Sequence, residues 1–251
     1  MMADDQRESA FRDQYRDVAS EGGLGRDSSV AGKTGDATRR QSYSQANLQG
    51  APAGSVEMAL GCGNPTAIAV LQPGEVVLDL GSGGGLDVFI AAKKVGPRGR
   101  AIGIDVTPEM VEKARQFATD GGYPNVEFRV AAMDSLPFPG DSIDVVISNC
   151  VINHATDKLA VFREAMRVLR PGGRMHVSDL VVEGEIPNAD NPELKVWREW
   201  LAVACGKQEY LRAVTDAGFR QVDVQECHYA GPGMVPALEG KIASLQIRAR
   251  K

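Results

Sequence analysis

Short apolar runs alternate with amphipathic stretches along most of the chain after residue 75. Runs of this length and composition predict strands, and the stretches with apolar positions three or four residues apart predict helices. Regular alternation of the two is typical of an α/β protein with a parallel sheet. The predicted strands are 76–79, 101–105, 125–130, 142–149, 174–180, 220–227 and 243–249, and the predicted helices are 86–93, 108–118, 157–169 and 192–217. We therefore predict a doubly wound, mostly parallel sheet of seven strands with one reversed edge strand.

Residues 76–85 combine an apolar run with a glycine-rich turn. Asp79 lies two residues before Gly81, the first glycine of a G-x-G-x-G pattern formed by Gly81, Gly83 and Gly85, and an amphipathic helix is predicted from residue 86. A buried strand that leads through such a turn into a helix indicates a nucleotide-type cofactor site, because glycine lets the backbone approach a ligand closely.

The glycine spacing separates this turn from the dinucleotide fingerprint. That fingerprint is G-x-G-x-x-G and holds a pyrophosphate, whereas here the order is G-x-G-x-G after an acid. The pattern resembles motif I of the class I S-adenosylmethionine (SAM) methyltransferases, and the carboxylate of Asp79 suits a ligand with an ammonium group. Asp105 ends the next strand at about the distance where an acid accepts from both ribose hydroxyls.

Two further strand ends complete the predicted cofactor site. In the same resemblance Asp134 meets the adenine amino group, although it could instead be a helix cap. The strand that ends at Asn149 points toward the transferable methyl group. The resemblance implies cofactor contacts at Tyr15, Asp79, Gly81, Ser82, Gly83, Gly85, Asp105, Val106, Met110, Ala132, Met133, Asp134 and Asn149.

Composition excludes several classes of protein. The chain has 251 residues, 43% of them hydrophobic, and a formal net charge of -5 without a basic patch, which argues against a nucleic-acid partner. No apolar run approaches 18 residues, so we expect no membrane partner. The four cysteines are irregularly spaced, and the N-terminus is too polar for a signal peptide. We expect a cytoplasmic protein with free thiols.

Two short cysteine-containing motifs carry a more specific resemblance. Residues 61–65 read Gly-Cys-Gly-Asn-Pro and residues 148–153 read Ser-Asn-Cys-Val-Ile-Asn. Together with the glycine turn and residues 106–110, they resemble the arsenite methyltransferase family nearly end to end. The resemblance implies that Cys62 and Cys150 bind trivalent arsenic, a soft centre that thiolates hold well. It also implies SAM as cofactor and a thiol reductant such as glutathione.

The chain departs from this family at the third ligand. Cys205 stands only five positions before Tyr210, and without a gap Trp200 falls on the ligand position. Cys205 is therefore an open candidate, and a site with two thiolates would suit methylarsenite better than arsenite.

Other interpretations remain open from the sequence. His154 follows the second cysteine motif and could be a general base, with Trp197 and Trp200 forming an aromatic wall of the acceptor pocket. The protein would then be a small-molecule C-, O- or N-methyltransferase. A non-catalytic SAM- or metalloid-binding protein is a third possibility. In each case we expect residues 1–50 to cap the cofactor with a helix over 5–19 and a mobile stretch over 20–40. Residues 51–182 would form the Rossmann-like core, and 183–251 an acceptor-side insertion with the closing strands.

Overall fold

The computed structural model describes residues 16, 19, 43–59, 61, 63–185, 194, 201, 204–228 and 236–251, with the side chains of 227 and 228 excepted. The predicted flexible stretch 20–40 and most of the predicted helix 5–19 lie outside these residues. Of the predicted helix 192–217, residues 192–193, 195–200 and 202–203 also lie outside, residues 204–206 are not helical, and a helix runs over Lys207–Asp216. Within them, no helix is long and apolar enough to cross a membrane.

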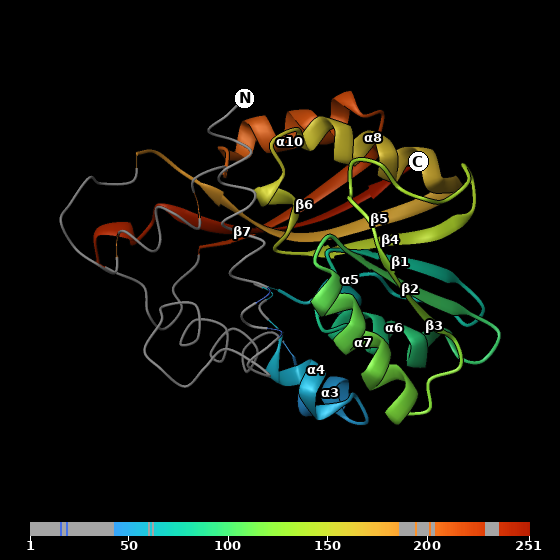
Figure 1. Cartoon of the computed structure of the whole chain (residues 1–251). Coiled ribbons are helices and arrows are strands. Elements are labelled where there is room, and N and C mark those ends of the chain that lie inside the picture. Colours follow the sequence, from blue (N-terminus) through green and yellow to red (C-terminus); the bar gives the residue numbers. More distant parts are fainter. Residues whose placement is uncertain are drawn as a thin grey trace.

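Seven strands form one sheet in the order β3-β2-β1-β4-β5-β7-β6 (Figure 1). They are β1 (Val76–Leu80), β2 (Arg100–Asp105), β3 (Val126–Val130), β4 (Ile143–Asn149), β5 (Leu169–Val182), β6 (Arg220–His228) and β7 (Ile242–Arg250). The mostly parallel sheet confirms the predicted fold class. The reversed strand is β7, which pairs antiparallel with both β5 and β6. The prediction of a reversed edge strand was wrong in this detail, since β7 lies inside the sheet and β6 forms the edge.

Helices cover both faces of the sheet (Figure 1). They are α3 (Gln45–Leu48), α4 (Ala53–Glu57), α5 (Pro65–Ile68), α6 (Leu86–Val95), α7 (Pro108–Asp120), α8 (Lys158–Val168) and α10 (Lys207–Asp216), with 3₁₀ turns η1 (Ile152–His154) and η2 (Pro236–Leu238). The sequence predicts α6 as amphipathic, but it is buried on nearly all sides and exposes only the region around Lys93.

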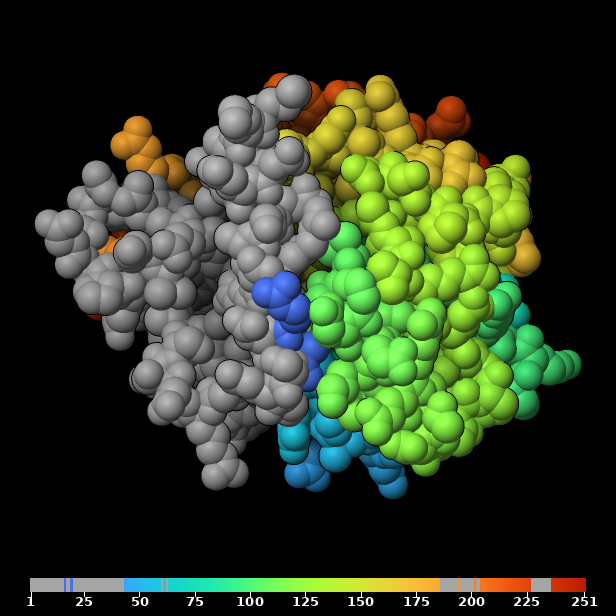
Figure 2. Space-filling view, viewed as in Figure 1, coloured from blue at the N-terminus to red at the C-terminus, as the bar shows by residue number. Residues whose placement is uncertain are grey.

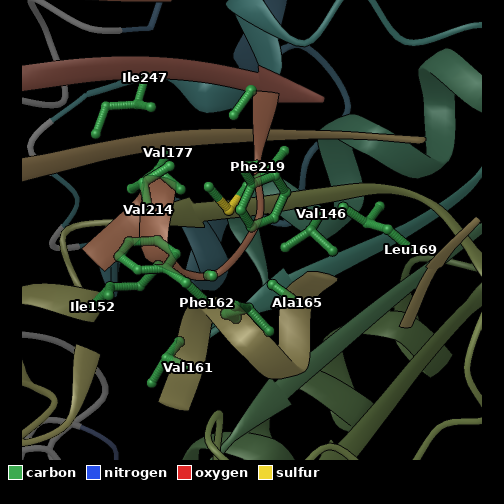
Figure 3. Packing of buried hydrophobic residues seen from close by; sticks show 14 of the residues in the cluster. Val146, Ile152, Val161, Phe162, Ala165, Leu169, Val177, Val214, Phe219 and Ile247 are labelled. Carbon is green, nitrogen blue, oxygen red and sulfur yellow. The ribbon is translucent and has the colours of Figure 1, made fainter. Parts of the chain in front are cut away.

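Alternate residues of the central strands build two apolar layers. Leu78, Ile102 and Val146 pack in the cluster that contains α8 and α10, whereas Val77 and Val145 pack with α6 and α7. Figure 3 shows the first layer, with the aromatic and branched side chains of α8, α10 and the strands interdigitated. This period-two alternation is what a sheet covered on both faces requires.

The Pro-Gly-Gly segment 171–173 lies within β5 instead of before it. The ladder between β4 and β5 passes from Ile143–Leu169 to Val145–Arg174, so the turn is a bulge in a long strand. Gly172 has a left-handed φ of 78°, which lets the chain rejoin the ladder after the proline.

Two parts of the chain before β1 have defined contacts with the rest of the molecule, one around Ala19 and one at the start of α5. Ala19, which is helical, packs against Met58 and Met110. The described N-terminal residues, blue in Figure 2, accordingly lie beside α7, in green. Further on, the side chain of Asn64 caps α5 by accepting from the backbone N–H of Ala67 at 2.9 Å.

Candidate active site

A cavity of about 280 Å³ opens at the carboxyl ends of β1, β2 and β4. Its wall comes from the glycine turn after β1, the start of α7, the turn after β3 and the segment after β4. Open α/β sheets bind their ligands at this edge, where neighbouring crossovers diverge.

Most of the predicted site residues line this cavity. They are Asp79, Gly81, Ser82, Gly83, Asp105, Val106, Met110, Ala132, Met133, Asp134, Asn149, Cys150 and His154. Gly85 does not line it but caps α6, packed against Phe128 and Phe89. Tyr15 and Cys62 lie outside the described residues, as do Trp197 and Trp200. Asp134 lies on a turn where no helix begins, so the helix-cap alternative is wrong.

The glycine turn is shaped by close packing and by one acid. Gly81 has a φ of 69°, and a Cβ there would lie 2.4 Å from the side chain of Val151, so only glycine fits. Asp105 accepts from the backbone N–H of Gly83 and from that of Thr107, each at 2.9 Å. One carboxylate therefore connects the turn after β1 to the start of α7.

Three buried acids face the same space. Asp79, Asp87 and Asp105 are at most 8% exposed. Burial raises the pKa of Asp79 well above its usual value, and the charges of Asp87 and Asp105 raise it further. Burial also raises the pKa of Asp105, and it raises the pKa of Asp87 to about 6. A cationic ligand would relieve this repulsion, so the cavity favours positive charge.

Asp87 and Tyr43 belong to the site although sequence reasoning gave them no role. The Tyr43 hydroxyl donates to Oδ2 of Asp87 at 2.7 Å, and Nδ2 of Asn149 donates to the same oxygen at 3.1 Å and to the Tyr43 hydroxyl at 2.8 Å. An acid within the apolar run 86–92 was the available signal, because buried acids need partners. The tyrosine, more than 100 residues from Asn149, gave no local signal.

Asn149 also contacts Gly63, the residue that follows Cys62 in the sequence. Its Oδ1 accepts from the N–H of Gly63 at 3.1 Å, and its Nδ2 donates to the carbonyl of Gly63 at 2.9 Å. A Cβ on Gly61 would lie 2.2 Å from Nδ2 of Asn149, and one on Gly63 would lie 2.5 Å from Cβ of Ser178. Gly61 and Gly63 therefore lie directly against the ends of β4 and β5, which the absence of a side chain on each allows.

Cys150 is placed at the mouth of β4 in an unusual backbone conformation. It has a left-handed φ of 62°, is 4% exposed and donates its N–H to the carbonyl of Ser178 at 2.7 Å. A non-glycine residue held in this conformation is strained, and such strain concentrates at functional sites. Cys150 is disulfide-bonded, which corrects the prediction that all four thiols are free.

His154 and Cys205 differ in their relation to the cavity. His154 lines it, and burial together with the charge of Lys158 lowers the pKa of its imidazole to about 3. Cys205 is half-buried and free, and it packs against the apolar cluster beneath α8 and α10 instead of lining the cavity. Burial raises the pKa of its thiol, against an opposing effect of Lys158. Among the described residues, no three His, Cys, Asp or Glu side chains form a metal site.

The fold and this cavity together define a methyltransferase domain. The family profile described as a methyltransferase domain matches residues 71–218, which contain the glycine turn, the acids and both strand ends of the site.

Individual relatives indicate which kind of methyltransferase this domain resembles. The arsenite methyltransferase of Halobacterium salinarum is 40% identical over 83% of this chain and 52% of its own length. The human arsenite methyltransferase is 36% identical over 57% of this chain and 40% of its own. The crystal structure of an arsenic(III) S-adenosylmethionine methyltransferase from Chlamydomonas reinhardtii superposes with a TM-score of 0.66 at 35% identity, over 82% of this chain and 72% of that one.

The chain belongs to the arsenite methyltransferase family of class I S-adenosylmethionine methyltransferases. It spans about half the length of the curated relatives it matches.

Proposed function

We propose that this protein transfers a methyl group from SAM to a trivalent arsenical held by the thiolates of Cys62 and Cys150. One observation carries the proposal. The side chain of Asn149, the residue before Cys150, pairs in both directions with the backbone of Gly63, the residue after Cys62. These contacts support a thiol pair at the mouth of the cavity that holds the three acids.

The cavity fits the proposed cofactor. Asp105, Ala132, Met133 and Asp134 all line the cavity, and we assign Asp105 to the ribose and the other three to the adenine ring. We assign Asp79 and the turn at Gly81 to the α-ammonium group at the amino-acid end of SAM. The amount of buried negative charge supports a ligand with both an ammonium and a sulfonium group. Tyr15 and a cap formed by residues 1–50 belong to the same proposal, as does the division at residues 51–182 and 183–251.

The thiolates supply the arsenic chemistry. Two thiolates displace hydroxyls from trivalent arsenic and leave it a lone pair, which is already an unprotonated nucleophile. When bound, SAM would supply the sulfonium methyl carbon that accepts this lone pair, with S-adenosylhomocysteine as the leaving group. The new As–C bond takes up the lone pair, so the methylated arsenic would be pentavalent until the thiol reductant returns it to the trivalent state. The protein contributes proximity and alignment in a site from which water is excluded. No general base is required.

The oxidation state of Cys150 supports a thiol reductant as a partner. A disulfide sulfur cannot bind arsenic as a thiolate, so Cys150 must be reduced before substrate binds. Glutathione is a reductant of the required class, and a reducing cytoplasm would keep the site competent.

The position of Cys205 supports a preference for methylarsenite. Cys205 does not line the cavity, so two thiolates are proposed to hold the arsenic. Two thiolates satisfy methylarsenite, whereas arsenite has a third hydroxyl to replace. We therefore expect faster conversion of methylarsenite.

A second candidate function is methylation of an organic acceptor with His154 as base. The observation in its favour is that His154 lines the cavity. A pKa of about 3 makes the imidazole a poor proton acceptor near neutral pH, which weakens this candidate.

The release of S-adenosylhomocysteine by reduced protein tests the proposal. The protein is incubated with SAM and excess glutathione, with methylarsenite, with arsenite or without acceptor. We expect release with both arsenicals, faster with methylarsenite, and methylated arsenic by mass spectrometry. Binding of SAM without release in any arsenical arm would contradict arsenical methylation and favour the organic acceptor or a binding protein.

A further inference from the structure

One carboxylate oxygen of Asp87 accepts no hydrogen bond within the described part of the chain, although it lies in a cavity that favours cations. Asp87 lies in the first turn of α6, is 7% exposed and lines the cavity. Its Oδ2 accepts from Tyr43 and Asn149. Its Oδ1 is buried and accepts no hydrogen bond from any described residue. A buried carboxylate oxygen left without a donor is costly, so this atom is suited to a donor that arrives with a ligand.

The surroundings of Asp87 indicate the charge of that donor. Asp79 lies close enough to Asp87 for the two carboxylates to repel each other, and Asp105 adds to the charge at Asp79. Among the described residues, Lys94 is a cation that acts on Asp87, but its ammonium donates to the carbonyl of Thr66 at 2.6 Å. A cationic donor stabilises this arrangement, whereas a neutral hydroxyl would leave the acids uncompensated.

The position of Asp87 indicates which part of the ligand it meets. Asp79 and Asp87 flank the glycine turn in the chain, and both line the cavity. Asp105 also lines it, but each of its oxygens already accepts a backbone N–H, from Gly83 and from Thr107. The ribose and adenine are assigned to Asp105 and to the turn at residues 131–134. The amino-acid end of the ligand is therefore left for Asp79 and Asp87.

We propose that Oδ1 of Asp87 accepts a hydrogen bond from the α-ammonium group of SAM, which makes Asp87 a cofactor-binding residue. This inference rests on the proposed function. The same carboxylate holds Asn149, which in turn holds Gly63 beside Cys62. One acid thus contacts the cofactor and supports the segment that carries the first arsenic thiol.

Calorimetric binding of three ligands tests the role of Asp87 without any arsenical. SAM and S-adenosylhomocysteine carry the α-ammonium group, whereas 5′-methylthioadenosine lacks the whole amino-acid part. For Asp87→Asn we expect about 10- to 100-fold weaker binding of the first two, the range of one charged hydrogen bond. Binding of 5′-methylthioadenosine should be unchanged.

Two variants separate this role from a structural one. Tyr43→Phe removes the tyrosine donor but keeps the carboxylate, so we expect a smaller loss that is equal for all three ligands. Asp216→Asn removes a charge from an exposed position at the end of α10 and should change nothing. The inference is overturned if Asp87→Asn weakens all three ligands equally, or if it leaves SAM binding intact. Failure of the wild-type protein to bind SAM would instead overturn the proposed function and the inference together.

Discussion

Asn149 organises the mouth of the cavity at the scale of single residues. Its amide contacts Tyr43, Gly63 and Asp87, which lie on three different segments. The sequence places Asn149 at the end of a strand and predicts that it faces the cofactor. It does not predict these contacts, because the partners are 62 to 106 residues away. Their meeting depends on how the sheet is assembled.

His154 shows how burial decides between two chemical roles. Because its pKa is about 3, the imidazole is neutral throughout the range between pH 5 and 8. We expect the pH profile of kcat/KM for methylarsenite to have the same shape in the wild type and in His154→Gln.

The measurement is a series of initial rates across that pH range with SAM at saturation. If His154 is a general base, the wild type will have an inflection between pH 5 and 7 that the variant lacks. The variant would then also be slower by about 100-fold or more, as expected for loss of a general base.

At the scale of elements, the sequence predicts six strands to within one residue at each end, but it begins β5 five residues late and does not give the order of the strands at one edge. The residues of β6 and β7 both alternate between polar and apolar, so neither pattern says which strand pairs with β5. The order depends on long-range pairing along β5, over Arg174–Val182. The bulge at residues 171–173 has a related origin, since Pro-Gly-Gly also signals a turn between separate elements.

The pairing of β5 with β7 predicts a pH dependence of stability. His176 of β5 pairs with Arg248 of β7 and is 5% exposed. Burial, followed by the charges of Arg174, Arg248 and Arg250, lowers the pKa of its imidazole to about 4. In the unfolded chain the imidazole takes up a proton near pH 6.5, whereas in the folded chain it does so only near pH 4. Stability should therefore fall as the pH drops through this window, by on the order of 3 kcal/mol from this group.

Replacing His176 with leucine tests this dependence. A leucine cannot take up a proton in the unfolded state, so this part of the slope should disappear. The free energy of unfolding from urea titrations at several pH values between 4 and 7.5 gives the measurement. Equal slopes for the wild type and His176→Leu would contradict the assignment.

At the scale of the whole molecule, the cavity forms where three distant parts of the chain meet. The glycine turn, the end of β4 and the segment around Gly61 and Gly63 come together at one edge of the sheet. The sequence predicts the first two from local patterns, since glycine spacing and strand ends are short-range signals. The third rests on the resemblance, and the packing of the two glycines against Asn149 and Ser178 now gives it a physical reason. The same assembly brings Asp79, Asp87 and Asp105 to one cavity, which gives the cavity its negative charge.

The most direct test of the central claim compares single cysteine variants in two assays at once. Cys62→Ser, Cys150→Ser, Cys205→Ser and Cys227→Ser are each reduced and assayed for methylation of methylarsenite and for calorimetric binding of SAM. The account predicts that the first two lose methylation while they keep wild-type SAM affinity. The last two should keep both. Methylation at the wild-type rate by Cys62→Ser or Cys150→Ser would contradict the claim that these two thiolates hold the arsenic.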